Sequence, residues 1–269
     1  RDVNKGYEFD SQIDLLPILG TIREGLNSNG FFLDLLAKEL NTERENILDF
    51  DLFLYLHEEG VVLGMENEFL SAPRLDDLGM CYAAVEALVE TQVEEGIHVV
   101  AMFDNEEVGS NTKAGAANGM LNSALLKIAE ALGYTKSNYD RALRDSFMLS
   151  ADAAHAVHPN KGEKSDPTNK PVLGGGIVIK QSASQKYVSD AEASAIFQQI
   201  CLSKGVKYQT FVNKSGLAGG STLGPLISQF LPVKGLDVGM PMLSMHSAKE
   251  LIAIEDFKNT KECPTQGHY

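Results

Sequence analysis

A chain of 269 residues, 43% of them hydrophobic, is long enough to bury one large core, or a large core and a small one. Its formal net charge of -14 opposes phosphate backbones and anionic lipid surfaces, and no stretch approaches the roughly twenty apolar residues of a membrane span. Neither nucleic acid nor a membrane is therefore an expected partner. The three cysteines, Cys81, Cys201 and Cys263, are widely spaced, odd in number and in no CxxC pair, so neither a disulfide framework nor a zinc ribbon is indicated and a reducing cytoplasm fits.

The first 65 residues differ in pattern from the rest of the chain. Residues 31–40 have the spacing of an amphipathic helix, and 42–45 have the spacing of a capping box before a short helical turn. Residues 49–57 alternate between apolar and polar side chains, which predicts a half-exposed strand. We interpret residues 1–65 as part of a smaller module and residues 66–269 as the main domain.

From about residue 76 onward, helical and strand-like patterns alternate along the chain. Helices are predicted over 80–95, 116–132 and 191–203, after Gly224, and from about 247. Strands are predicted over 97–103, 147–151, 177–180, 208–212 and 236–238, the first of them buried on both faces. This alternation is typical of an α/β protein, with helices on both faces of a sheet.

Three apolar, strand-like runs end abruptly in carboxylates or histidine. Residues 99–103 lead into Glu106 and Glu107, 147–151 into Asp152, and 240–245 into His246. Functional groups gather at the carboxyl ends of strands in open α/β sheets, and Asp76 belongs to the same set. Because buried carboxylates need partners, we expect a pair of divalent cations here: zinc by ligand type, with manganese or cobalt as alternatives.

Two short segments allow both a functional and a structural interpretation. In extended backbone Glu106 and Glu107 would point opposite ways, so one could bind a metal while the other acts as general base. Taken alone, the Asp-Asn-Glu-Glu segment is more often an exposed acidic turn. Backbone N–H groups at Gly220 and Ser221 could bind a substrate carboxylate or an oxyanion, although an ordinary helix N-cap explains that segment nearly as well.

Several blocks resemble the aspartyl aminopeptidase family of dinuclear zinc exopeptidases, in the family order and over nearly the whole chain. They are the segments 74–78, 103–110, 150–160, 220–225 and 245–247. The resemblance implies a three-layer α/β/α zinc-exopeptidase-like domain. It also implies that residues 1–65 are the C-terminal part of an inserted dimerisation module, so a homo-oligomer is expected.

Carried over residue by residue, the resemblance assigns roles to six positions. Asp76 would bridge two metals, and Glu106 would be the general base. The terminal metal ligands would be Glu107, Asp152 and His246. Lys180 matches the family lysine that recognises an acidic substrate side chain, although taken alone a lysine at a strand end is usually just solvated. The implied activity is release of N-terminal residues, preferably Asp or Glu, from a peptide substrate.

The sequence departs from the family pattern at three points. No His-x-Asp element precedes Asp76, which leads us to expect an N-terminally truncated chain. Asp77 stands where the family usually has Asn, and Gly216 where Asp is more frequent. Two alternatives therefore stay open beside the aminopeptidase. One is a catalytically incompetent fragment or assembly scaffold with the same fold, and the other is a related dinuclear amidohydrolase that needs Glu106 but not Lys180.

Overall fold

The computed structural model describes residues 6–21, 30–92 and 96–262. The chain divides into two units, of which the first ends at Leu54 and the second begins at Tyr55. No helix in the described ranges is both long and apolar enough to cross a membrane.

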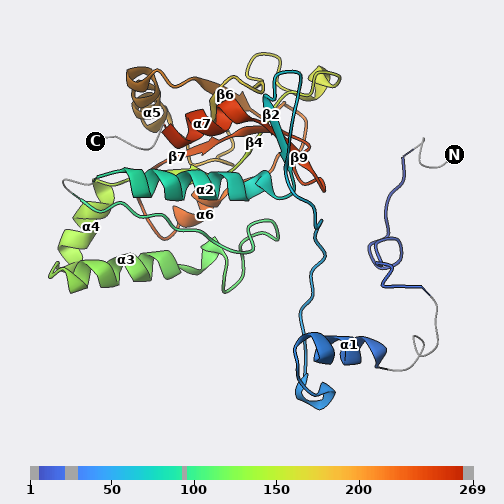
Figure 1. Cartoon of the computed structure of the whole chain (residues 1–269). Coiled ribbons are helices and arrows are strands. Elements are labelled where there is room, and N and C mark those ends of the chain that lie inside the picture. Colours follow the sequence, from blue (N-terminus) through green and yellow to red (C-terminus); the bar gives the residue numbers. More distant parts are fainter. Residues whose placement is uncertain (1–5, 22–29, 93–95, 263–269) are drawn as a thin grey trace. The chain divides into compact units, whose positions relative to one another are not determined.

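The first unit contains the predicted helix and little other regular structure. Helix α1 spans Phe31–Glu39, and the 3-10 helix η2 spans Arg44–Asn46 (Figure 1). The predicted capping box is wrong, because Glu43 precedes η2 and makes no side-chain cap. The predicted strand over 49–57, which runs into the second unit, is also wrong. No described segment pairs with it, and Phe50 instead packs edge-to-face on Phe32 with ring centroids 5.9 Å apart.

The second unit is built on a four-stranded sheet with the order β3-β7-β5-β6. Its strands are β3 (Phe147–Ala151), β7 (Lys234–Gly239), β5 (Ile177–Gln181) and β6 (Tyr208–Val212). All four predicted strands in these regions are confirmed. β3 and β7 run parallel, as do β5 and β6, but β5 is antiparallel to β7. The carboxyl ends of β3 and β5 therefore point in opposite directions.

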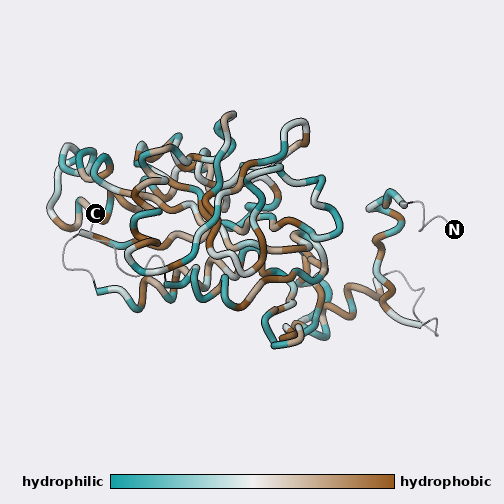
Figure 2. Tube along the Cα trace, turned by 90° about the horizontal axis from the view of Figure 1, so that it is seen from above, coloured by the Kyte–Doolittle hydropathy of each residue, from teal (hydrophilic) through white to brown (hydrophobic). Residues whose placement is uncertain are grey.

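Helices cover both faces of this sheet, so the predicted α/β/α layering is confirmed. Side chains of Ile179 and Val238 pack on one face against Phe197 of α5 (Ala191–Lys204). On the other face, Met148 packs against a cluster that includes Ile227 of α6 (Leu223–Ile227) and residues of α3 (Met120–Ala131) and α4 (Lys136–Arg144). Figure 2 shows hydrophobic stretches running through the middle of this unit. The 3-10 helices η3 (Ala116–Asn118) and η4 (Gly162–Lys164) lie in the connections.

A second sheet has the order β1-β2-β9-β8-β4. Its strands are β1 (Val61–Leu63), β2 (Phe69–Ala72), β9 (Glu250–Ala253), β8 (Pro241–Leu243) and β4 (Ala154–His155). The helix predicted from about residue 247 is therefore wrong at its start. Residues 250–253 pair with both β2 and β8, and the helix α7 begins only at Ile254 and ends at Glu262. Ladder hydrogen bonds on both sides outweigh the helical spacing here.

The segment 97–103 forms no strand, which corrects the prediction of a strand buried on both faces. Ile97, Val99 and Met102 are about half exposed, and no described strand pairs with the segment. It lies beside a cavity of about 310 Å³ that is also lined by β3 and by α2 (Leu75–Glu90). Hydrophobicity alone predicted burial, but a strand also needs a hydrogen-bonding partner.

Candidate metal centre

The start of α2, shortly after β2 ends, positions two neighbouring carboxylates. Asp76 and Asp77 belong to the first turn of α2 but have non-helical backbone angles, so the regular helix begins after them. The side chain of Asp76 is only 5% exposed. Sequence analysis placed the helix start at residue 80, and the structure instead places both carboxylates in the irregular first turn.

Glu106 and Glu107 lie in a tight turn. The N–H of Gly109 donates to the carbonyl of Glu106 at 2.9 Å, and the N–H of Ser110 donates to the carbonyl of Asn105 at 2.9 Å. Extended backbone, which the sequence argument assumed for this pair, is therefore wrong. The two side chains nevertheless differ in their surroundings: Glu106 is half-buried in the site cavity, whereas Glu107 is exposed and reaches His246.

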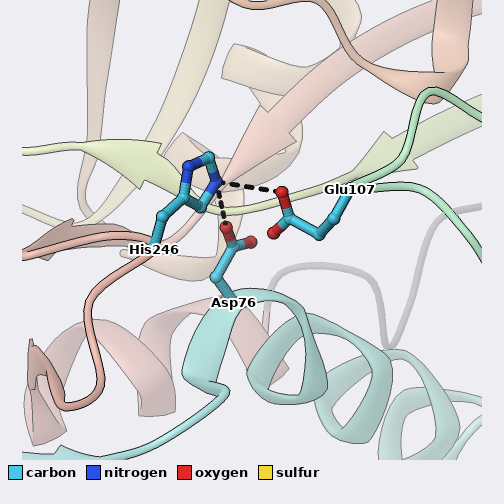
Figure 3. Close-up of side chains that lie close together, drawn as sticks. All are labelled: Asp76, Glu107 and His246. Atoms are coloured by element: carbon cyan, nitrogen blue, oxygen red, sulfur yellow. Dashed lines mark ion pairs between the residues drawn. The ribbon is translucent and has the colours of Figure 1, made fainter. Parts of the chain in front are cut away.

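His246 brings the first cluster together. It lies in the connection between β8 and β9, and its Nε2 is 3.3 Å from Oδ2 of Asp76 and 3.2 Å from Oε2 of Glu107. Figure 3 shows the three side chains converging from three separate segments of the chain. One imidazole and two carboxylates with their ligand atoms within 4.8 Å of one another form a set suited to zinc.

Asp152, directly after β3, forms a second cluster with Asp76 and Asp77. One oxygen from each of the three carboxylates lies within 4.8 Å of the others. Oδ2 of Asp152 also accepts a hydrogen bond from Nζ of Lys180 at 3.0 Å, and Lys180 is only 4% exposed. Asp76 belongs to both clusters, so the structure brings all four predicted ligand residues, Asp76, Glu107, Asp152 and His246, into one site.

The clustered carboxylates repel one another, and the strength of this repulsion indicates whether the site suits a cation. Burial, and then the negative charge of Asp152, raises the pKa of Asp76 to about 8 and that of Asp77 to about 9. Oδ1 of Asp77 is buried and accepts no hydrogen bond from the described residues. A buried carboxylate oxygen without a hydrogen bond is unfavourable, and a divalent cation among the clustered carboxylates would offset their mutual repulsion. The residues present therefore fit a metal.

Glu106 also carries a raised pKa. Burial is the largest cause, followed by the charges of Asp152 and Glu107, while Lys180 and His246 act in the opposite direction. A raised carboxylate pKa favours proton exchange near neutral pH, which is what a general base needs.

A cavity of about 260 Å³ adjoins the carboxylates and contains the remaining predicted residues. Its lining includes Glu106, Lys180, Gly220 and Ser221. The hydroxyl of Ser221 donates to the carbonyl of Lys186 at 3.0 Å, which fixes the loop in place. The alternative interpretation, an ordinary helix N-cap, is wrong with respect to side-chain capping. Thr222 occupies the N-cap position of α6, but its side chain makes no cap hydrogen bond.

Sequence reasoning missed several residues of this cavity. Tyr187 and Phe211 form an edge-to-face pair with centroids 6.3 Å apart, and Nζ of Lys180 lies 5.7 Å from the Tyr187 ring centroid. Both aromatic residues line the cavity. Burial lowers the pKa of Lys180, but the neighbouring Asp152 charge and hydrogen bond outweigh it, and the net shift is upward. No local spacing distinguishes Tyr187 or Phe211 from ordinary core aromatics, so a one-dimensional pattern offers no signal for them.

Comparisons with known proteins place the chain among zinc peptidases. The family model described as aminopeptidase I zinc metalloprotease (M18) matches residues 1–263. A probable M18 family aminopeptidase 2 from Clostridium novyi (strain NT) is 48% identical over 256 residues, which cover 95% of this chain and 59% of that protein. The chain thus spans about three fifths of the length of this curated relative.

Solved structures show the same similarity. A chain in the cryo-EM structure of the Ape4 and Nbr1 complex matches with a TM-score of 0.90 and 32% identity, over 98% of this chain and 54% of that one. The S. cerevisiae mApe1 dodecamer matches with a TM-score of 0.75 and 27% identity, over 93% of this chain and 58% of that one.

Proposed function

The chain belongs to the M18 family of zinc metalloproteases, and from this membership we propose that it carries the catalytic body of a zinc aminopeptidase. The observation that carries the proposal is the convergence of Asp76, Glu107 and His246 from three distant segments. Their chemistry matches the zinc named for the family.

We propose that the site holds two zinc ions with Asp76 shared between them. Glu107 and His246 would complete one ion's protein ligands, and Asp152 would bind the other. Manganese or cobalt could replace zinc, because carboxylate and imidazole ligands also suit these metals. Zinc supplies Lewis acidity, which polarises a carbonyl group and lowers the pKa of water.

We propose Glu106 as the general base. It lines the cavity beside the carboxylates but belongs to neither ligand cluster, so its carboxylate is available for proton transfer. It accepts the proton of the attacking water and passes it to the leaving amine as the peptide bond breaks. Backbone N–H groups at Gly220 and Ser221 lie across the same cavity, where they can bind a substrate carboxylate or an oxyanion.

Lys180 supports a preference for acidic N-terminal residues. It is a buried cation in the wall of the cavity, and a substrate carboxylate that enters the cavity can reach it. The strongly acidic protein repels acidic peptides at long range, so a local cation must provide the discrimination.

We infer that the protein assembles with copies of itself and that residues 1–65 contribute to this contact. Several large apolar side chains of the first unit are more than half exposed, among them Phe9, Ile18, Leu48 and Phe53. Exposed apolar surface of this kind marks interaction sites. The mApe1 relative is a dodecamer.

A metal-binding scaffold without catalysis is the second candidate. The observation in its favour is that the two ligand clusters contain a single imidazole, His246, among the described residues. A related amidohydrolase would keep Glu106 as the base but have no need for Lys180.

Hydrolysis by the zinc-loaded protein separates these candidates. The assay uses p-nitroanilides of Asp, Glu and Leu, with bound zinc measured in parallel. An aminopeptidase releases nitroaniline, fastest from Asp or Glu, and Glu106→Gln lowers kcat about a hundredfold while zinc stays bound. The matched control is Glu130→Gln, an exposed glutamate on α3. Zinc binding without any hydrolysis would favour the scaffold, and equal rates on all three substrates would remove the acidic preference.

A further inference from the structure

We infer that Glu250 is a positioning residue for the metal site, acting through the backbone of Asp76 and His246. Its carboxylate is 3% exposed. Oε2 accepts a hydrogen bond from the N–H of Asp76, and Oε1 accepts one from the N–H of His246, both at 2.8 Å. This inference rests on the zinc site of the proposed function.

The strand pairing explains how one side chain reaches both residues. Glu250 is the first residue of β9, and its Cα pairs with that of Ala72 at the end of β2, shortly before α2 begins at Leu75. On its other side β9 pairs with β8, and His246 lies in the connection between these two strands. In the sequence, Asp76 lies 174 positions from Glu250, whereas His246 lies only four positions from it. Glu250 therefore lies where the segment before α2 and the β8–β9 connection meet.

Both residues held by Glu250 have backbone that their own elements do not fix. Asp76 has non-helical angles although it belongs to the first turn of α2. His246 has a φ of 65°, in the left-handed region that non-glycine residues seldom adopt. A hydrogen bond to each N–H restrains these conformations. The side chains then face each other, with 3.3 Å between Asp76 Oδ2 and His246 Nε2.

The carboxylate suits this task better than an amide does. A carboxylate offers two oxygen acceptors to two N–H donors, whereas the amide of glutamine offers one acceptor and turns its NH₂ group toward the second donor. Glu250→Gln consequently keeps the size of the side chain but loses one of the two restraints. Residues that orient metal ligands from outside the coordination sphere typically change metal affinity ten- to a hundredfold when replaced.

Zinc affinity measured on folded protein tests the inference. The dissociation constant is obtained by competition with a chromophoric chelator, with wild type, Glu250→Gln, the control Glu255→Gln and the reference His246→Ala compared at one pH. Glu255 is an exposed glutamate in the first turn of α7, so its replacement changes the charge equally without touching either N–H. We expect Glu250→Gln to bind zinc at least about tenfold more weakly and Glu255→Gln to match wild type within about twofold.

The melting temperature of each zinc-free protein separates positioning from plain stability. A role in stability alone lowers the melting temperature of Glu250→Gln and leaves the zinc affinity of its folded fraction unchanged, which would overturn the inference. If His246→Ala binds zinc as wild type does, the proposed site itself fails. If only the Glu250 variant behaves as wild type, the site stands and the positioning role fails.

A measurement on the unaltered protein covers the case in which Glu250→Gln does not fold. Amide hydrogen exchange in the zinc-free wild type reports directly on the two N–H groups. We expect the amides of Asp76 and His246 to be protected to a similar degree, because one buried carboxylate accepts from both. Unprotected exchange at either amide would overturn the inference.

Discussion

Lys180 and Asp152 form a partly buried ion pair in which Nζ lies 3.0 Å from Oδ2. The lysine is 4% exposed, and it also faces the ring of Tyr187. This pair links two parts of the proposed site, because Asp152 belongs to a carboxylate cluster and Lys180 lines the cavity beside it. Binding of metal and binding of an acidic substrate therefore involve neighbouring charges, and both proposals can be tested by substitution.

Replacing Lys180 by methionine should reduce the preference for acidic substrates. A charge-assisted hydrogen bond to a buried group contributes roughly 1.5 to 3 kcal/mol, so kcat/KM for Asp and Glu substrates should fall about tenfold or more. The rate for a Leu substrate should change much less. Lys234→Met is the control, since Lys234 pairs with the exposed Glu192 instead. Relative rates that stay the same across the three substrates would exclude Lys180 from substrate recognition.

Removing the shared ligand should remove more metal than removing a terminal one. Asp76 belongs to both clusters, whereas His246 belongs to one. We expect Asp76→Ala to lose two zinc ions per chain and His246→Ala to lose mainly one. Inductively coupled plasma mass spectrometry of the purified proteins gives the zinc content. Equal loss in the two variants would contradict a bridging role for Asp76.

Membership in a zinc aminopeptidase family was predicted from sequence blocks and is confirmed, as is the α/β/α layering. Strands such as 147–151 and 208–212 were predicted with their observed bounds, because a short run that contains apolar and aromatic residues between turn signals identifies a strand well. The clustering of Asp76, Asp152 and His246 could also be anticipated, since Asp152 and His246 each follow an apolar, strand-like run and Asp76 was assigned to the same set.

What could not be predicted depends on contacts between distant segments. The strand at 250–253 depends on partners in β2 and β8, and the apolar segment 97–103 remains unpaired among the described residues. Glu250 illustrates the same point at the level of one side chain. Its role depends on an N–H 174 positions away, and no local sequence pattern contains that information.

Alanine at Gly176 should destabilise the protein strongly. Gly176 has a φ of 95°, and an added Cβ would lie 2.0 Å from the carbonyl oxygen of Lys207. Since Lys207 O also accepts the N–H of Ile177 at the start of β5, the backbone cannot move away without losing that bond. We expect the free energy of unfolding to fall by more than about 2 kcal/mol, measured by urea denaturation. Gly162→Ala is the control, because its added Cβ meets no atom within 4 Å. Similar stabilities of the two variants would contradict this packing.

The stability of the zinc-free protein should depend on the ionisation of Asp256. This carboxylate on α7 is fully buried and accepts hydrogen bonds from the N–H groups of Gly174 at 2.6 Å and Gly176 at 2.8 Å. Burial raises its pKa to about 6, although the two hydrogen bonds act in the opposite direction. A raised folded-state pKa means that the folded protein holds the proton more tightly than the unfolded chain. The resulting stabilisation is complete below about pH 4 and is lost as the pH rises through about 6.

Asp256→Asn removes this ionisation, so comparing the variant with wild type measures how much the ionisation changes the free energy of unfolding. As the pH rises from 4 to 7, the free energy of unfolding of the asparagine variant should increase by on the order of 2 to 3 kcal/mol relative to that of wild type. The reason is that a shift of one pKa unit corresponds to about 1.4 kcal/mol. Urea denaturation of both zinc-free proteins at several pH values measures the difference, and zinc is omitted because its binding has a pH dependence of its own. Asp145→Asn, at an exposed aspartate after α4, corrects for the general effect of lost charge. If the free energies of unfolding of wild type and Asp256→Asn change in parallel with pH over this range, Asp256 keeps an ordinary carboxylate pKa in the folded protein. Its two glycine N–H donors would then stabilise the anion enough to offset its burial.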